Sequence, residues 1–183
     1  MESDAVGQLV AAAQANAPWA FARLYRHFSA AVCGYLRAQG AEDPEGLTNE
    51  VFLGAFRRLG AFTGDGDGFR SWLFTIAHHR LVDDRRRRAR TLATAPLDRS
   101  VDPRAGGDVE DDALARLAGG EAMALLDGLP PDQRAVLTLR VVADLSIAET
   151  AGILGKQPGA VKSLQHRALE ALRRKLSHEG VSA

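Results

Sequence analysis

The residues best suited to chemistry lie between His78 and Arg90. Two adjacent histidines, His78-His79, and two adjacent carboxylates, Asp83-Asp84, precede a run of arginines. Neighbouring residues of a helix point about 100° apart. The carboxylate pair is therefore a poor metal site for a nucleic-acid enzyme, and the histidine pair lacks the spacing and partners of a zinc site. The arginines instead favour binding to phosphate groups.

A second group of polar and basic residues lies near the carboxyl end. Ser146 and Glu149 fit a capping box, Gly155 suits the end of the same helix, and Pro158 suits the first turn of the next. The sequence therefore predicts a helix-turn-helix. The second helix of such a motif places polar side chains in the major groove, while Lys and Arg bind phosphates. The candidates on its polar face are Lys162, Ser163, His166 and Arg167.

Helices must position both groups. Apolar residues at spacings of three and four predict three long amphipathic helices, with stripes that begin at Phe21, Leu47 and Phe69, and a shorter helix before them. Phe69 and Trp72 lie on the third stripe and are expected in the core, whereas Phe74 lies off it and stays open to stacking on unpaired bases. In the second helix of the helix-turn-helix, the stripe expected to be buried is Val161, Leu164, Ala168, Leu172 and Leu176.

Two segments interrupt this helical pattern. Residues 64–68 alternate glycine with aspartate and predict a mobile loop between the second and third long helices, without the terminal Glu of a calcium loop. Residues 91–112 are poor in large apolar side chains, and six acids lie between Asp98 and Asp112. The sequence thus predicts an all-α fold of two small helical domains, residues 1–90 and 113–183, joined by a flexible acidic linker, residues 91–112.

The composition narrows the class of protein. The 183 residues carry no net charge, but six Lys or Arg between Lys156 and Lys175 face only one acid, Glu170. Such segregation favours a nucleic-acid partner, although any single charge run also fits a solvated helix face. The lone Cys33 excludes an internal disulfide and a paired-cysteine zinc site. No signal peptide or membrane span is recognisable, so we expect a cytoplasmic protein without metal or cofactor.

In order and content, these segments resemble the extracytoplasmic-function sigma factors of the sigma-70 family, which are subunits of bacterial RNA polymerase. Residues 43–52 are similar to the region 2.2 helix of that family, and residues 69–90 to regions 2.3 and 2.4. Residues 129–134 and the helix-turn-helix are similar to region 4. A short linker stands where other sigma factors have a region 3 domain.

The resemblance implies a promoter-specificity subunit with no catalytic activity of its own. It implies binding to the β′ clamp helices and β flap of core RNA polymerase, to promoter DNA, and to an anti-sigma factor. The residues implied to bind polymerase are Leu47, Asn49, Glu50, Phe52, Leu53 and Arg57. Those implied to melt and read the −10 element are Gly64, Asp65, Gly66, Asp67, Gly68, Arg70, His78, His79, Asp83, Arg86, Arg87 and Arg88, with the glycine loop helping to hold a flipped base. Those implied to read the −35 duplex are Gln157, Gly159, Ala160, Lys162, Ser163, His166 and Arg167.

The chain departs from the family pattern at several of these positions. Gly46 stands where Asp is common, Asn49 where Gln is common, and His79 where Asn is frequent. Gln157 replaces Ser or Thr, and Leu164-Gln165 replaces an Arg-Leu pair. No standard promoter sequence is therefore transferred to this chain.

Two other classes of protein remain open. An ordinary DNA-binding regulator would use only the helix-turn-helix, with the N-terminal helices as a dimerisation or sensing domain. A nucleic-acid enzyme would use Asp83-Asp84 as metal ligands, against the geometry given above. Mutation of Asn49 and Glu50 separates the regulator from the sigma factor, because only the sigma factor needs a polymerase-binding helix.

Overall fold

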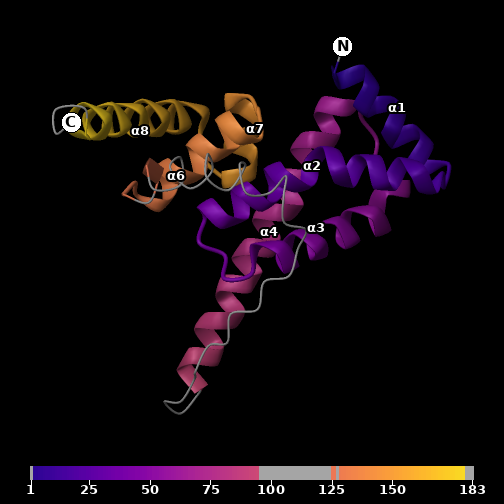
Figure 1. The fold of residues 1–183 in the computed structure, drawn as a ribbon, viewed down its shortest axis with the longest axis horizontal. Coiled ribbons are helices and arrows are strands. Elements are labelled where there is room, and N and C mark those ends of the chain that lie inside the picture. Colours follow the sequence, from indigo (N-terminus) through magenta and orange to yellow (C-terminus); the bar gives the residue numbers. More distant parts are fainter. Residues whose placement is uncertain (1, 95–124, 127, 180–183) are drawn as a thin grey trace.

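The computed structural model describes residues 2–94, 125–126 and 128–179, and all its regular elements are helices (Figure 1). The predicted all-α fold is confirmed. The N-terminal bundle consists of α1 (Glu2–Gln14), α2 (Pro18–Ala38), α3 (Pro44–Arg58), the 3₁₀ turn η1 (Leu59–Ala61) and α4 (Gly66–Thr94). The C-terminal unit consists of α6 (Pro131–Leu137), the π-helical turn η2 (Thr138–Val142), α7 (Ile147–Leu154) and α8 (Pro158–Glu179).

Helix α4 organises the N-terminal bundle. Its first half packs against α1, α2 and α3, while its second half projects away from the rest of the molecule (Figure 1). The helix ends at Thr94, beyond the predicted domain boundary at residue 90. The remainder of the predicted linker lies outside the described residues.

Phe74 is buried although the hydrophobic pattern of the sequence does not place it on the apolar stripe. It lies off the apolar stripe of α4, yet it is fully buried, with its ring 5.9 Å from the ring of Tyr35 on α2. Because several helices cover α4, its buried face is wider than one amphipathic stripe. Phe69 is buried and Trp72 partly buried in the same core, as predicted.

The predicted glycine loop is largely helical. Only Gly64 and Asp65 precede α4, and the Asp65 carboxylate accepts a hydrogen bond of 2.8 Å from the backbone N–H of Gly68. This contact caps the start of the helix. At Gly66, a Cβ atom would lie 2.1 Å from the carbonyl oxygen of Ser3 on α1. The glycine is thus required by the close approach of α1, and the prediction of a mobile loop over residues 64–68 is wrong for its second half.

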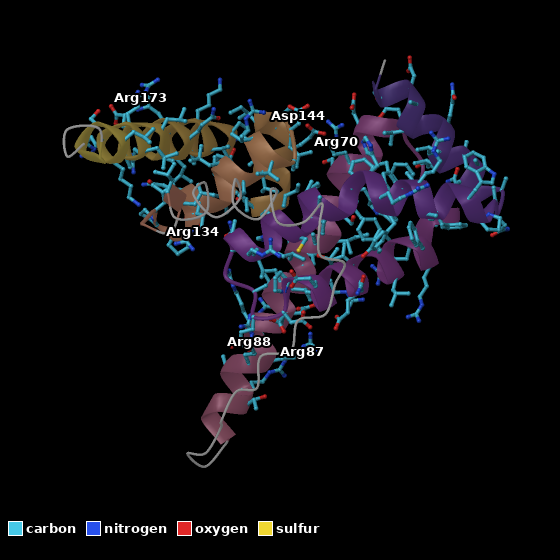
Figure 2. The ribbon with its side chains drawn as sticks, in the orientation of Figure 1. Arg70, Arg87, Arg88, Arg134, Asp144 and Arg173 are labelled. Carbon is cyan, nitrogen blue, oxygen red and sulfur yellow. The ribbon has the colours of Figure 1, made fainter. Side chains whose placement is uncertain are left out.

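The two units share one core. Four apolar side chains of the C-terminal unit join the main apolar cluster of the N-terminal bundle: Leu139, Ala143, Leu145 and Ile153. At the edge of this contact, the buried amide of Gln39 donates a 3.1 Å hydrogen bond to the hydroxyl of Thr138. Arg70 and Asp144, labelled in Figure 2 where the units meet, form an ion pair of 3.2 Å. The C-terminal unit is therefore docked on α2 and α4.

The helix-turn-helix has the predicted local geometry. The Ser146 hydroxyl accepts from the Glu149 N–H at 3.2 Å, and the Glu149 carboxylate accepts from the Ser146 N–H at 2.7 Å. Gly155 ends α7 with φ of 62°, in the left-handed region where glycine is favoured. Leu176, expected on the buried stripe of α8, is instead 53% exposed, because the apolar clusters of the C-terminal unit extend along that helix only as far as Leu172.

We expect Ser146→Ala to lower the free energy of unfolding by about 1 kcal/mol, the usual effect of losing a capping hydroxyl. Urea denaturation followed by circular dichroism measures this change. The matched control is Ser177→Ala on α8, where an exposed hydroxyl bonds the Arg173 carbonyl of its own helix at 2.9 Å. We expect the control to change stability by less than about 0.5 kcal/mol. Equal losses in both variants would contradict a specific capping role.

Candidate nucleic-acid interface

One face of helix α3 is exposed to solvent, and it carries both polar and apolar side chains. The Asp43 carboxylate accepts a 2.8 Å hydrogen bond from the Gly46 N–H and caps the start of the helix, where Pro44 is favoured. Four of the predicted polymerase-binding residues are exposed: Asn49, Glu50, Leu53 and Arg57. The other two, Leu47 and Phe52, are buried in the core. They hold α3 in place rather than presenting a side chain to a partner.

Tyr25 on α2 extends this face, and the sequence analysis did not select it. Its hydroxyl donates a 2.9 Å hydrogen bond to the side-chain oxygen of Asn49, and its ring lies 4.8 Å from that of Phe52. The contact fixes the side chain of Asn49, so that its amide N–H₂ remains directed away from Tyr25. Leu53, at 56% exposure, adds a large apolar group to the same helix. Such a mixed patch is typical of a protein-binding surface.

A groove of about 650 Å³ lies between α3, α4 and α7. Four of the residues predicted to read the −10 element line it: His78, His79, Asp83 and Arg86. Arg58 and Arg80 lie in the same groove, so basic groups outnumber the single carboxylate. Residues 153–155, at the end of α7, form its opposite wall. The groove favours an anionic ligand such as a nucleic-acid strand.

His78 differs from the other groove residues because its ring reaches into the bundle. Its Nδ1 atom lies 2.8 Å from the hydroxyl oxygen of the fully buried Tyr35. Burial, followed by the electrostatic influence of His79 and Arg85, lowers the pKa of His78 below its usual range. Burial likewise raises the pKa of Tyr35. His78 is therefore held in its neutral form.

The predicted arginines of α4 are not equivalent. Arg70 is paired with Asp144 of the C-terminal unit and is largely covered. Arg88 lies 3.1 Å from Glu42 and 2.5 Å from Asp84, and its side chain is only 26% exposed. Arg86 and Arg87 are more exposed, with ion-pair distances of 4.0 Å and 3.7 Å to Asp83 and Asp84. Exposed pairs of this kind are weak, so these two arginines are the more available to phosphate. Arg87 is labelled in Figure 2.

The two ends of α4 do not form one site. Gly64, Asp65 and Asp67 are exposed at its start, whereas Gly66 is buried and Gly68 partly buried. Twenty residues at 1.5 Å each separate this start from Arg86, a distance of about 30 Å along the helix. The structure therefore does not bring the glycine segment together with the arginine tract.

Helix α8 and Gln157, the residue just before it, present all of the residues predicted to read the −35 element. Each of Gln157, Gly159, Ala160, Lys162, Ser163, His166 and Arg167 is exposed. Val161 and Ala168 are buried, and Leu164 is partly buried, against the rest of the C-terminal unit. The apolar face of α8 thus packs inward and leaves the polar face open at the start of the helix.

Arg140 of η2 supports this helix, although the sequence pattern gave it no such role. Its guanidinium donates to the carbonyl of Leu145, just before α7, and through Nε to the side-chain oxygen of Gln165 at 3.4 Å. One side chain therefore links the segment before α7 to α8. The contact between Arg140 and Gln165 joins residues distant in sequence, so hydrophobic periodicity could not reveal it.

Neither a metal centre nor a membrane span is found in the part of the chain that the structure describes. No three His, Cys, Asp or Glu side chains come together there as metal ligands. No helix among those residues is both long and apolar enough to cross a bilayer.

Comparison with known proteins relates both the N-terminal and the C-terminal part of the chain to one family. The sigma-70 region 2 family matches residues 14–91, and the sigma-70 region 4 family matches residues 120–172. The chain is 39% identical over 174 residues to the ECF RNA polymerase sigma factor BldN of Streptomyces coelicolor, which covers 92% of this chain but 65% of BldN. It is 33% identical to the ECF RNA polymerase sigma factor SigD of Mycobacterium tuberculosis, covering 94% of this chain and 84% of SigD. The chain thus spans less than two thirds of BldN and most of SigD.

Two solved structures share the fold over most of the chain. CnrH in complex with the cytosolic domain of CnrY superposes with a TM-score of 0.66 at 25% identity, covering 96% of this chain and 99% of CnrH. RpoE of Bartonella quintana, in complex with the anti-sigma factor NepR, superposes with a TM-score of 0.63 at 21% identity, covering 86% of this chain and 96% of RpoE.

We expect His78 to make stability depend on pH. The unfolded state binds a proton to this side chain near pH 6.5, whereas the folded state does so only at lower pH, because its pKa is lowered. The free energy of unfolding should therefore fall as pH drops below about 6.5 and level off below the folded pKa. Urea denaturation between pH 8 and pH 5 measures this loss. His78→Gln should show a smaller loss than the wild type, and an identical pH profile would contradict the assignment.

Proposed function

Because the chain belongs to the sigma-70 family, within its extracytoplasmic-function group, we propose that it is a promoter-specificity subunit of bacterial RNA polymerase. It binds core polymerase through α3, the −10 element through α4 and the −35 element through α8. The observation that carries the proposal is the open polar face at the start of α8, in a chain whose α3 separately presents Asn49, Glu50, Leu53 and Arg57. One protein thus has both a DNA-facing helix and a protein-facing helix.

The C-terminal unit suits recognition of duplex DNA. The start of α8 enters the major groove, where Lys162, Ser163 and Arg167 lie on its exposed face. Lys and Arg reach guanine acceptors or phosphates, and Ser contacts either a base or the backbone. Arg140 keeps α7 and α8 in register during this contact.

The groove beside α4 suits a single strand. His79, Asp83 and Arg86 offer polar contacts, while Arg86 and Arg87 bind phosphates. Removing a base from the stack costs a few kcal/mol, which such contacts offset. Gly64, Asp65 and Asp67 are the members of the glycine segment left accessible for a flipped base. The polymerase supplies the remaining contacts and all of the chemistry, so the chain itself is no enzyme.

We also propose that an anti-sigma factor controls the chain. The supporting observations are the likeness to CnrH, which was solved in complex with the cytosolic domain of CnrY, and the shared fold of RpoE, which was solved in complex with the anti-sigma factor NepR. The exposed faces of α3 and α8 are the surfaces that such a partner would cover. Action in the cytoplasm follows from the proposal, because core polymerase works there.

The test is run-off transcription with purified core polymerase on a genomic promoter library. We expect the chain to create new transcript starts, and Leu53→Glu to reduce them at every promoter, because a charge would enter an apolar contact. The matched control is Gln8→Glu, which places the same side chain on an exposed part of α1 and should leave the transcripts unchanged. Arg167→Ala should weaken −35 use by about 1–3 kcal/mol without affecting polymerase binding.

Two outcomes would count against the proposal. Unchanged transcript starts on addition of the wild-type chain would exclude a sigma factor. Promoter-dependent transcription that survives Leu53→Glu and the combined Asn49→Ala and Glu50→Ala changes would favour a regulator that uses only its helix-turn-helix.

A further inference from the structure

Tyr35 lies beneath α4 with its hydroxyl group buried. The side chain is fully inaccessible, and its ring packs against Phe74. Within the described residues, the one hydrogen-bond partner of its hydroxyl is Nδ1 of His78, at 2.8 Å. Tyr35 and His78 lie on different helices and are distant in sequence. The contact therefore joins the floor of the core to a side chain that lines the groove.

Each ring carries a defined number of protons. The raised pKa of Tyr35 keeps its hydroxyl protonated. The lowered pKa of His78, caused mainly by burial and then by His79 and Arg85, keeps the imidazole neutral at pH 7. A neutral imidazole carries one N–H, either at Nδ1 or at Nε2, and the hydrogen bond of the other nitrogen selects between them.

The buried hydroxyl decides this choice. If Nδ1 donated to Tyr35, the phenolic hydrogen would need another acceptor, and the described residues provide none. A buried donor left without a partner costs about 1–3 kcal/mol, which is roughly a factor of 5 to 150 in population. Tyr35 therefore donates to Nδ1, and the histidine proton resides on Nε2.

We propose that Tyr35 is a positioning residue for promoter reading, which fixes His78 as the Nε2–H tautomer and thereby directs one hydrogen-bond donor into the groove. Nε2 lies across the ring from the nitrogen that faces Tyr35, and the ring lines the groove beside His79, Asp83 and Arg86. This inference rests on the proposed function, because it takes the groove to hold the −10 strand.

The fixed tautomer has a chemical consequence for the ligand. A group that can only donate pairs with acceptors, such as O6 and N7 of guanine, O4 of thymine or a phosphate oxygen. It does not pair with the exocyclic amino groups of adenine and cytosine, which are also donors. His78 thus favours acceptor groups of the strand without carrying a charge.

The tautomer is tested on the free protein by long-range ¹H–¹⁵N correlation NMR of ¹⁵N-labelled histidine, with the His78 signals assigned from His78→Gln. We expect a protonated Nε2 and an unprotonated Nδ1 in the wild type at pH 7.5, and a mixture of tautomers in Tyr35→Phe. A protonated Nδ1 in the wild type, or signals unchanged by Tyr35→Phe, would overturn the inference. This reading does not depend on whether the chain is a sigma factor.

The role in promoter reading is tested by transcription with core polymerase. We expect Tyr35→Phe to lower promoter-dependent transcription by about three- to tenfold, the loss of one oriented hydrogen bond. In His78→Gln, the amide N–H₂ stands near the place of Nε2 and needs no tautomer. Tyr35→Phe should therefore cause no further loss in that background.

Equal losses from Tyr35→Phe in both backgrounds would show a merely structural role and sink the proposal. Thr75→Val is the matched control for the loss of a hydroxyl hydrogen bond, since it removes a partly buried α4 hydroxyl that bonds the Ser71 carbonyl at 2.8 Å. It should leave transcription unchanged. If the wild-type chain directs no transcription, the proposed function fails, while the NMR result still decides the tautomer.

Discussion

The burial of α4 from several sides is the constraint on which the rest of the structure depends. Phe69, Leu73 and Phe74 are buried in the first half of the helix, and α1, α2, α3 and α7 all contact it. A helix so enclosed cannot rotate or slide without breaking the core. The polar side chains that face the groove are consequently held in fixed positions, and His78 is fixed most firmly, through Tyr35. The same packing that stabilises the fold therefore sets the geometry of the candidate site.

Local signals were read correctly because they act over a few residues. The capping box of Ser146 and Glu149 and the left-handed Gly155 define the helix-turn-helix without any tertiary contact. Periodicity likewise placed the open face of α8. Gly66 was wrongly placed in a mobile loop and the role of Phe74 stayed open, since their environment is made by α1 and α2, which no local pattern reveals.

The candidate sites show the same limit. The sequence selected the exposed residues of α3 and α8 but also buried ones, Leu47 and Phe52, because similarity of a whole helix does not separate its two faces. It gave no warning that Arg70 is paired with Asp144, nor that Tyr25 and Arg140 orient their polar neighbours. Each of these contacts joins distant segments, and a single sequence carries no record of such pairings.

The C-terminal unit is docked on α4, so it competes with any ligand that would bind the side of α4 that it covers. Ile153 and Leu154 stand at the groove, and Gln39–Thr138 and Arg70–Asp144 tie the two units together. A ligand that needs the covered side of α4 binds only those molecules in which the two units have separated. Its apparent dissociation constant is therefore the intrinsic constant divided by the fraction of separated molecules. A docked state favoured by about 1.4 kcal/mol would weaken that binding roughly tenfold. The contacts between the two units thus set the fraction of molecules in which the covered side of α4 is available to a ligand.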